Sequence, residues 1–79
     1  MLRSWSSPRE TKIGGLTCLM LSWQVNYCDL VVYIAKDEPR VFVGQGDFPP
    51  READSLEVQA LAERFNSSEL WAVLKRMQG

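Results

Sequence analysis

Histidine is absent from this chain of 79 residues, and there are only two cysteines, Cys18 and Cys28. Histidine is the commonest general base near neutral pH and the commonest metal ligand, so its absence removes most familiar catalytic and metal-binding arrangements. The cysteines lack the C-x-x-C spacing of a zinc or redox site, and we interpret them as buried or half-buried thiols in a reducing compartment. A bridge between neighbouring strands is the alternative, and it would require an oxidising location. We expect no metal and no cofactor.

The chain also lacks long hydrophobic runs and has no large excess of charge of either sign. No stretch approaches the roughly 18 consecutive apolar residues of a membrane-spanning helix. The run from Leu16 to Leu21 is too short for a secretory signal and no cleavage site follows it. Nine Lys and Arg against ten Asp and Glu give a net charge of −1, which favours neither nucleic acid nor an anionic membrane. We therefore expect a cytoplasmic protein with no membrane contact.

What is present is an ordinary globular composition, with 46% apolar and 24% charged residues. A chain of this length forms one domain, and a core of this size rarely supplies more than about 3–5 kcal/mol of stability. Such domains often gain further stability from association. The composition therefore favours a homodimer or a complex with a partner protein.

The first fifteen residues, MLRSWSSPRETKIGG, show no sustained hydrophobic period. We interpret residues 1–15 as a flexible N-terminal arm and residues 16–79 as a single domain. Met20 opens the first strongly patterned segment, so either Met1 or Met20 is compatible with a natural start.

Alternation of apolar and polar residues predicts strands within residues 17–46. Over residues 17–27 the apolar positions are Leu19, Leu21, Trp23, Val25 and Tyr27, which indicates a half-buried strand. A helix is the rival, because Leu16, Leu19, Met20 and Trp23 also fit a helical spacing. LVVYIA at 30–35 and RVFVG at 40–44, joined by a turn with Pro39, predict a hairpin. LVVYIA is apolar on both faces, which predicts a central strand with helices on one face and another layer, such as a second copy, on the other.

Gly44-Gln45-Gly46 resembles part of a phosphate-binding turn, but the third glycine of the dinucleotide motif is missing and Pro49 takes its place. We interpret these glycines as residues that allow positive φ at the end of a strand.

Two helices are expected, at about residues 50–65 and 68–78. The first has an apolar stripe, and Asp54 with Glu57 has the spacing of a capping box. Acidic residues at the start of this helix interact favourably with the helix dipole. Because no nucleophile or metal ligand set accompanies Asp47, Glu52 and Asp54, we expect no enzymatic activity. The second follows Ser67 or Ser68 as N-cap, and its stripe is Leu70, Val73, Leu74 and Met77, with Trp71 beside the stripe.

The segment ALAERFNSSELWAVLKR loosely resembles a helix-turn-helix motif, with Ala62 as the small residue of the first helix and Asn66 in the turn. The resemblance implies a DNA-binding transcriptional regulator. Ser67 departs from the usual apolar residue after the turn. The start of the second helix also offers Ser68 and Glu69 where base readout favours Arg, Lys, Asn or Gln.

We therefore predict an α+β fold, with a small antiparallel sheet of two or three strands covered by a C-terminal pair of helices. The favoured function is a small non-enzymatic protein-binding module that docks on a larger partner and modulates or inhibits it, as accessory or phage-type regulators do. DNA binding through the helix pair is the alternative. The expected partner-binding residues are Trp71 and Trp23 as apolar anchors, with Phe48 and Arg76 at the rim.

Overall fold

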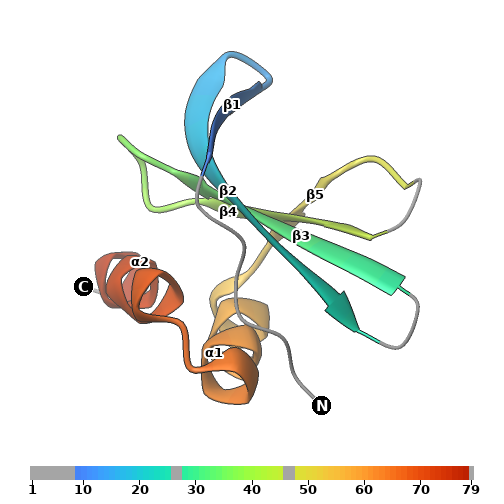
Figure 1. The fold of residues 1–79 in the computed structure, drawn as a ribbon. Helices are drawn as coiled ribbons and strands as arrows, with labels where there is room; N and C mark the ends of the chain where they lie inside the picture. Colours follow the sequence, from blue (N-terminus) through green and yellow to red (C-terminus); the bar gives the residue numbers. More distant parts are fainter. Residues whose placement is uncertain (1–8, 26–27, 46–47, 79) are drawn as a thin grey trace.

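The computed structural model describes residues 9–25, 28–45 and 48–78, and the side chains of residues 23–25 and 28 lie outside the described part. The described chain forms a five-stranded antiparallel sheet in the order β1-β2-β3-β4-β5, followed by two helices (Figure 1). The α+β class is confirmed, whereas the expected count of two or three strands is too low. The elements are β1 Arg9–Ile13, β2 Leu16–Val25, β3 Cys28–Ala35, β4 Val41–Gln45, β5 Arg51–Ala53, α1 Ser55–Phe65 and α2 Ser68–Gln78.

Strand β1 lies within the segment that we interpreted as a flexible arm, so that interpretation is wrong for residues 9–15. Gly14 and Gly15 have φ of +54° and +87°, and they form a two-residue turn between β1 and β2. Two positive φ values in succession are the requirement of the type I′ turn, which matches the natural twist of a hairpin and favours glycine. Three of the five residues of β1 are charged, so its sequence lacks the apolar alternation that predicts a strand. Residues 1–8 of the expected arm lie outside the described part.

The strands predicted from alternation are confirmed. β2 is a strand and not the rival helix, and the hairpin of β3 and β4 closes through residues 36–40, where the backbone N–H of Ala35 donates to the carbonyl of Arg40 at 3.0 Å. β3 is the central strand of the sheet, as its apolar composition indicated. The interpretation of positive φ is wrong at Gly44, since positive φ among the described glycines occurs at Gly14 and Gly15, and Gly46 lies outside the described part.

The register of the sheet excludes a disulfide between the two cysteines. Cys18 is opposite Ala35, the last residue of β3, whereas Cys28 is the first residue of that eight-residue strand. At about 3.3 Å per residue this separates the two positions by roughly 23 Å, and a disulfide requires Cα atoms within about 7 Å. Cys18 is a free, buried thiol.

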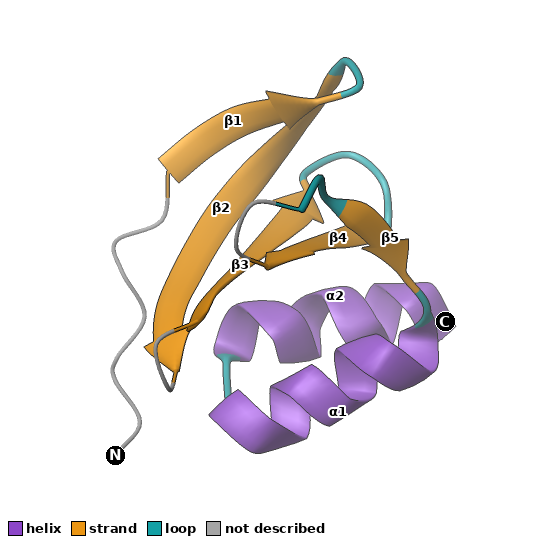
Figure 2. Ribbon diagram, turned by 90° about the vertical axis from the view of Figure 1, so that its right-hand side faces the viewer, coloured by secondary structure: helices purple, strands orange, loops and turns teal. Residues whose placement is uncertain are grey.

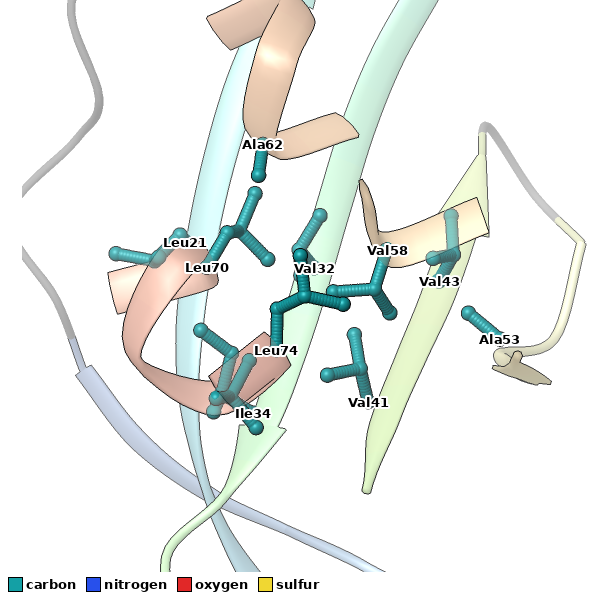
Figure 3. Close-up of a cluster of buried hydrophobic side chains, with 11 residues drawn as sticks. Leu21, Val32, Ile34, Val41, Val43, Ala53, Val58, Ala62, Leu70 and Leu74 are labelled. Atoms are coloured by element: carbon teal, nitrogen blue, oxygen red, sulfur yellow. The ribbon is translucent and has the colours of Figure 1, made fainter. Parts of the chain in front are cut away.

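Both helices cover the same face of the sheet (Figure 2). Side chains from four strands and both helices meet in one apolar cluster (Figure 3), whose members are Leu21, Val32, Ile34, Val41, Val43, Ala53, Val58, Ala62, Leu70, Val73 and Leu74. Alternate residues of β3 and β4, namely Val32 with Ile34 and Val41 with Val43, belong to it, as expected for strands with one face on a core.

The opposite face is partly covered by the chain itself. The β1–β2 hairpin bends away from the helices (Figure 2), and Ile13 and Leu16 at its turn pack against buried Cys18, Ala35 and Phe42. At this end of the sheet the second layer that we expected over β3 is therefore supplied by the hairpin.

The first helix begins later than expected. Residues 51–53 form β5 instead of a first helical turn, and the side chain of Asp54 accepts a hydrogen bond from the backbone N–H of Glu57 at 2.8 Å. This confirms the predicted capping role of Asp54 and moves the helix start to Ser55. Pro50 therefore directly precedes a short edge strand.

The two helices are joined by Asn66 and Ser67. Asn66 adopts the left-handed conformation, with φ of 52°, and its N–H donates to the carbonyl of Ala62 at 2.7 Å. Asparagine tolerates this conformation better than most residues, which explains why α1 ends here. The hydroxyl of the buried Ser67 accepts from the N–H of Leu70 at 3.3 Å, so Ser67 is the N-cap of α2. The predicted bounds of the second helix are confirmed.

Candidate functional site

The most informative surface feature is a groove between α2 and the part of the sheet where β2 begins and β3 ends. α2 contributes Glu69, Ala72, Val73 and Arg76, whose spacing places them on one side of the helix. The sheet side consists of Leu19 on β2 and the end of β3 with the residue after it, namely Ile34, Ala35 and Lys36. The hollow between them has a volume of about 260 Å³.

The groove exists because the helix pair does not reach the start of β2. Leu21 on this strand is fully buried, whereas Leu19 on the same face is only half-buried. On the helix side, the small exposed side chain of Ala72 leaves space that a larger residue would fill. The result is an apolar floor that is open to solvent along one side of α2.

Three charged residues line this floor, and two of them have partners inside the protein. Lys36 forms an ion pair with Glu10 of β1. The carboxylate of Glu69 accepts hydrogen bonds from the hydroxyls of Ser67 and Ser68, both at 3.2 Å. The hydrogen bond from Lys36 is the main reason that the pKa of Glu10 lies below its usual range, so this carboxylate stays charged at neutral pH.

Arg76 is the third charged residue, and it retains free donors. Its Nη1 donates to the backbone carbonyl of Lys36 at 3.4 Å, a long and weak hydrogen bond. Among the described residues, no carboxylate forms an ion pair with it. A guanidinium has five N–H donors in a planar fork suited to a carboxylate. Arg76 therefore presents an unused anion-binding group at the edge of an apolar groove.

Of the four expected partner-binding residues, three have described side chains, and these three do not share one hollow of the surface. Trp71 is 37% exposed, but it lies five residues before Arg76, which places the two about 140° apart around the helix. Phe48 is 80% exposed and lies in the connection between β4 and β5. Trp23 is in β2, and its side chain lies outside the described part. Of the three residues with described side chains, only Arg76 lines the groove.

Phe48 lines a second hollow of about 370 Å³, together with Val43, Gln45, Pro49 and Arg51. Arg51, the charged residue among them, is bound to both carboxylate oxygens of Glu57, at 2.8 and 2.5 Å. This hollow therefore offers an exposed aromatic ring, and its guanidinium already has a partner.

Sequence reasoning missed most of the groove. Leu19 was recognised as an inward-facing strand residue, but nothing in its neighbourhood showed that the helices would leave it half-covered. Ala72 and Lys36 carry no sequence pattern that distinguishes them from other surface residues. Only the packing of α2 across β3 brings these positions together.

Two of the three acidic residues considered for catalysis, Glu52 and Asp54, have structural partners. Glu52 accepts two hydrogen bonds from Arg40, at 3.1 and 3.0 Å, which lower its pKa, and Asp54 caps α1. Asp47 lies outside the described part. Within the described residues, no group of three or more His, Cys, Asp or Glu side chains is placed to hold a metal ion.

The structure defines this protein as a small α+β domain with an accessible groove beside its last helix. Neither described helix is long and apolar enough to cross a membrane. Comparison with protein-family models, curated proteins and solved structures found no match to this chain.

Proposed function

We propose that this protein is a small non-enzymatic binding module of the cytoplasm, which docks on a larger partner protein and modulates or inhibits it. The observation that supports the proposal is the groove along α2, where an apolar floor lies beside the free donors of Arg76. Apolar area supplies affinity, and a single charged anchor at the edge supplies orientation.

The proposed occupant is a segment of the partner that carries an apolar side chain and a nearby carboxylate. The apolar side chain would lie over Leu19 and Ala72, and the carboxylate would accept the guanidinium of Arg76. Such charge-assisted hydrogen bonds are about twice as strong as neutral ones. The charged lining, Lys36 and Arg76 against Glu69, has a net positive charge, which favours an acidic over a basic segment.

The experiment uses matched alanine positions on the two helices. Ala72 in the groove and Ala60 on α1 are both exposed, so Ala72→Glu and Ala60→Glu change helix stability by similar amounts. A partner captured from the source cells is purified, and its affinity for each variant is measured by calorimetry. We expect Ala72→Glu to weaken binding at least tenfold and Ala60→Glu to leave it within about twofold.

Arg76→Gln tests the anchor separately. Loss of a hydrogen bond between charged groups costs about 1.5–3 kcal/mol, which corresponds to roughly a 10- to 150-fold weaker complex. Equal affinities of Ala72→Glu, Arg76→Gln and the wild type would show that partners bind elsewhere. Modulation is then measured as the activity of the purified partner with and without the wild-type protein.

The observations do not favour the DNA-binding alternative. Two residues separate α1 and α2, whereas the helix-turn-helix motif has a turn of three or four. The face of α2 that contains Leu70, Val73 and Leu74 is packed against the sheet. Its exposed residues near the start, where a recognition helix reads bases, are Ser68, Trp71 and Ala72, and Lys75, Arg76 and Gln78 come only in the last turns.

A further inference from the structure

The two edges of the sheet differ in their capacity to pair with another strand. β5 has only three residues, and Pro49 and Pro50 directly precede it. Proline has no N–H, so pairing cannot extend in that direction. β1 has five residues, and no strand of the described chain pairs with its outer side. The open edge is therefore that of β1.

The register identifies which backbone groups of β1 point outward. Ile13 and Leu16 flank the two-residue turn, which makes them a hydrogen-bonded pair in a type I′ hairpin. Hydrogen-bonded and non-bonded pairs alternate along an antiparallel ladder, so the next pair, Lys12 and Thr17, is non-bonded. Accordingly, the carbonyl of Thr17 points the other way and accepts from the N–H of Lys36 at 3.0 Å. The N–H and C=O groups of Lys12, and two residues earlier those of Glu10, therefore face outward.

The sequence of this edge is complementary to itself. If a second copy of β1 lies antiparallel with Thr11 opposite Thr11, each Glu10 is opposite Lys12 of the other copy. Both members of each pair have outward backbone groups, so the two pairs form four backbone hydrogen bonds. Both side chains are exposed, and Lys12 has no ion pair with any described residue.

Other registers either lose the backbone hydrogen bonds or place like charges opposite each other. A shift by one residue places outward groups opposite inward ones and forms no ladder. A shift by two places Glu10 opposite Glu10, or Lys12 opposite Lys12, and cross-strand like charges are destabilising. A lysine on an edge strand discourages pairing with most sequences, but here it is the matching charge for Glu10 of a second copy.

We propose that β1 is the interface of a symmetric homodimer, in which two copies pair antiparallel about Thr11 and form one continuous sheet of ten strands. The two-fold axis runs through the sheet between the two Thr11 residues, so the helix pairs of both copies lie on the same face. The groove beside α2 of each copy then borders the dimer interface. This proposal does not depend on the proposed function, because a groove on a monomer binds a partner equally well.

The test is sedimentation equilibrium of the full chain from about 5 µM to about 500 µM, since a single pair of short strands is a small interface and we expect micromolar affinity. Glu10→Lys or Lys12→Glu creates two like-charge pairs and should weaken the dimer about tenfold or more. The double variant Glu10→Lys with Lys12→Glu restores two opposite-charge pairs and should recover the wild-type affinity.

A matched control separates the interface from the intramolecular ion pair. Lys36→Met removes the partner of Glu10 within the chain and should leave the dimer affinity within about twofold. In hydrogen exchange, the amides of Glu10 and Lys12 should gain protection as protein concentration rises, whereas that of Thr11 is already bonded to β2. A monomer at every concentration would overturn the proposal. So would a dimer that ignores both charge reversals, or a double variant that stays monomeric.

Discussion

The packing of the helices is tested most sharply by comparing two Leu→Ala variants, one at a buried and one at an exposed leucine. Leu70 on α2 is 0% exposed and lies in the apolar cluster, whereas Leu56 on α1 is 76% exposed. Both residues are in helices, so Leu→Ala changes helix propensity by the same small amount at each. The difference between the two variants therefore reports burial alone.

The expected magnitude follows from the size of the side chain that is removed. Leu70→Ala deletes three carbon groups at about 0.8 kcal/mol each, and the cavity left in the cluster raises the cost to about 3–5 kcal/mol. A domain of this size has only about 3–5 kcal/mol of stability from its core. We therefore expect Leu70→Ala to be largely unfolded at 25 °C and Leu56→Ala to stay within about 0.5 kcal/mol of the wild type.

Urea unfolding followed by circular dichroism measures both variants. Val58→Ala provides an intermediate point, because Val58 is also fully buried but loses two carbons, for an expected cost of about 1.5–3 kcal/mol. Similar unfolding midpoints for the Leu70 and Leu56 variants would refute the packing of α2 against the sheet.

Three further results are expected. Asp54→Ala removes the N-cap of α1 and should lower the free energy of unfolding by about 1 kcal/mol, as measured in urea. In an NMR titration, the pKa of Glu52 should lie below the usual glutamate range, and Arg40→Met should raise this pKa back into that range. The stability that the lowered pKa contributes is present at neutral pH and is lost as the pH falls through the folded-state pKa. Burial raises the pKa of the Cys18 thiol, so in a Cys28→Ser background a thiol reagent should react with Cys18 at the rate of unfolding, and fast reaction of the native protein would contradict its burial.

The sequence predicted the parts of this fold that have strong local patterns. Alternation identified β2, and the β-branched run of β3 identified the central strand, because burial on both faces demands apolar residues at every position. Asp54, Asn66 and Ser67 marked the helix ends, since their side chains satisfy backbone groups or tolerate a left-handed turn.

The two edge strands, β1 and β5, were not predicted from the sequence, and the reason is physical. β1 and β5 have few buried residues, so their sequences carry charges instead of a clear alternation. Gly14-Gly15 was the available sign of a hairpin turn, and it was interpreted as part of a flexible arm. Strand pairing with β2 and β4 fixes these segments, and such pairing is a tertiary effect that local propensity does not contain.

The site was predicted less well than the fold. Exposed aromatic residues are a reasonable guide to binding surfaces, but neither Trp71 nor Phe48 lines the groove. The groove depends on which part of β2 the helices leave uncovered. Arg76 was expected at the rim, and among the expected residues with described side chains it is the one that lines the groove. Its position there results from the packing of α2 and not from its neighbours in sequence.

The most direct test of the proposed binding surface is photo-crosslinking from single positions in the presence of the purified partner. A benzophenone amino acid replaces Ala72 in one variant and Ala60 in the other, since both sites are exposed and helical. If the groove is the docking surface, position 72 should crosslink to the partner and position 60 should not, and excess wild-type protein should suppress the crosslink. Crosslinking from position 60 alone, or equally from both, would contradict it.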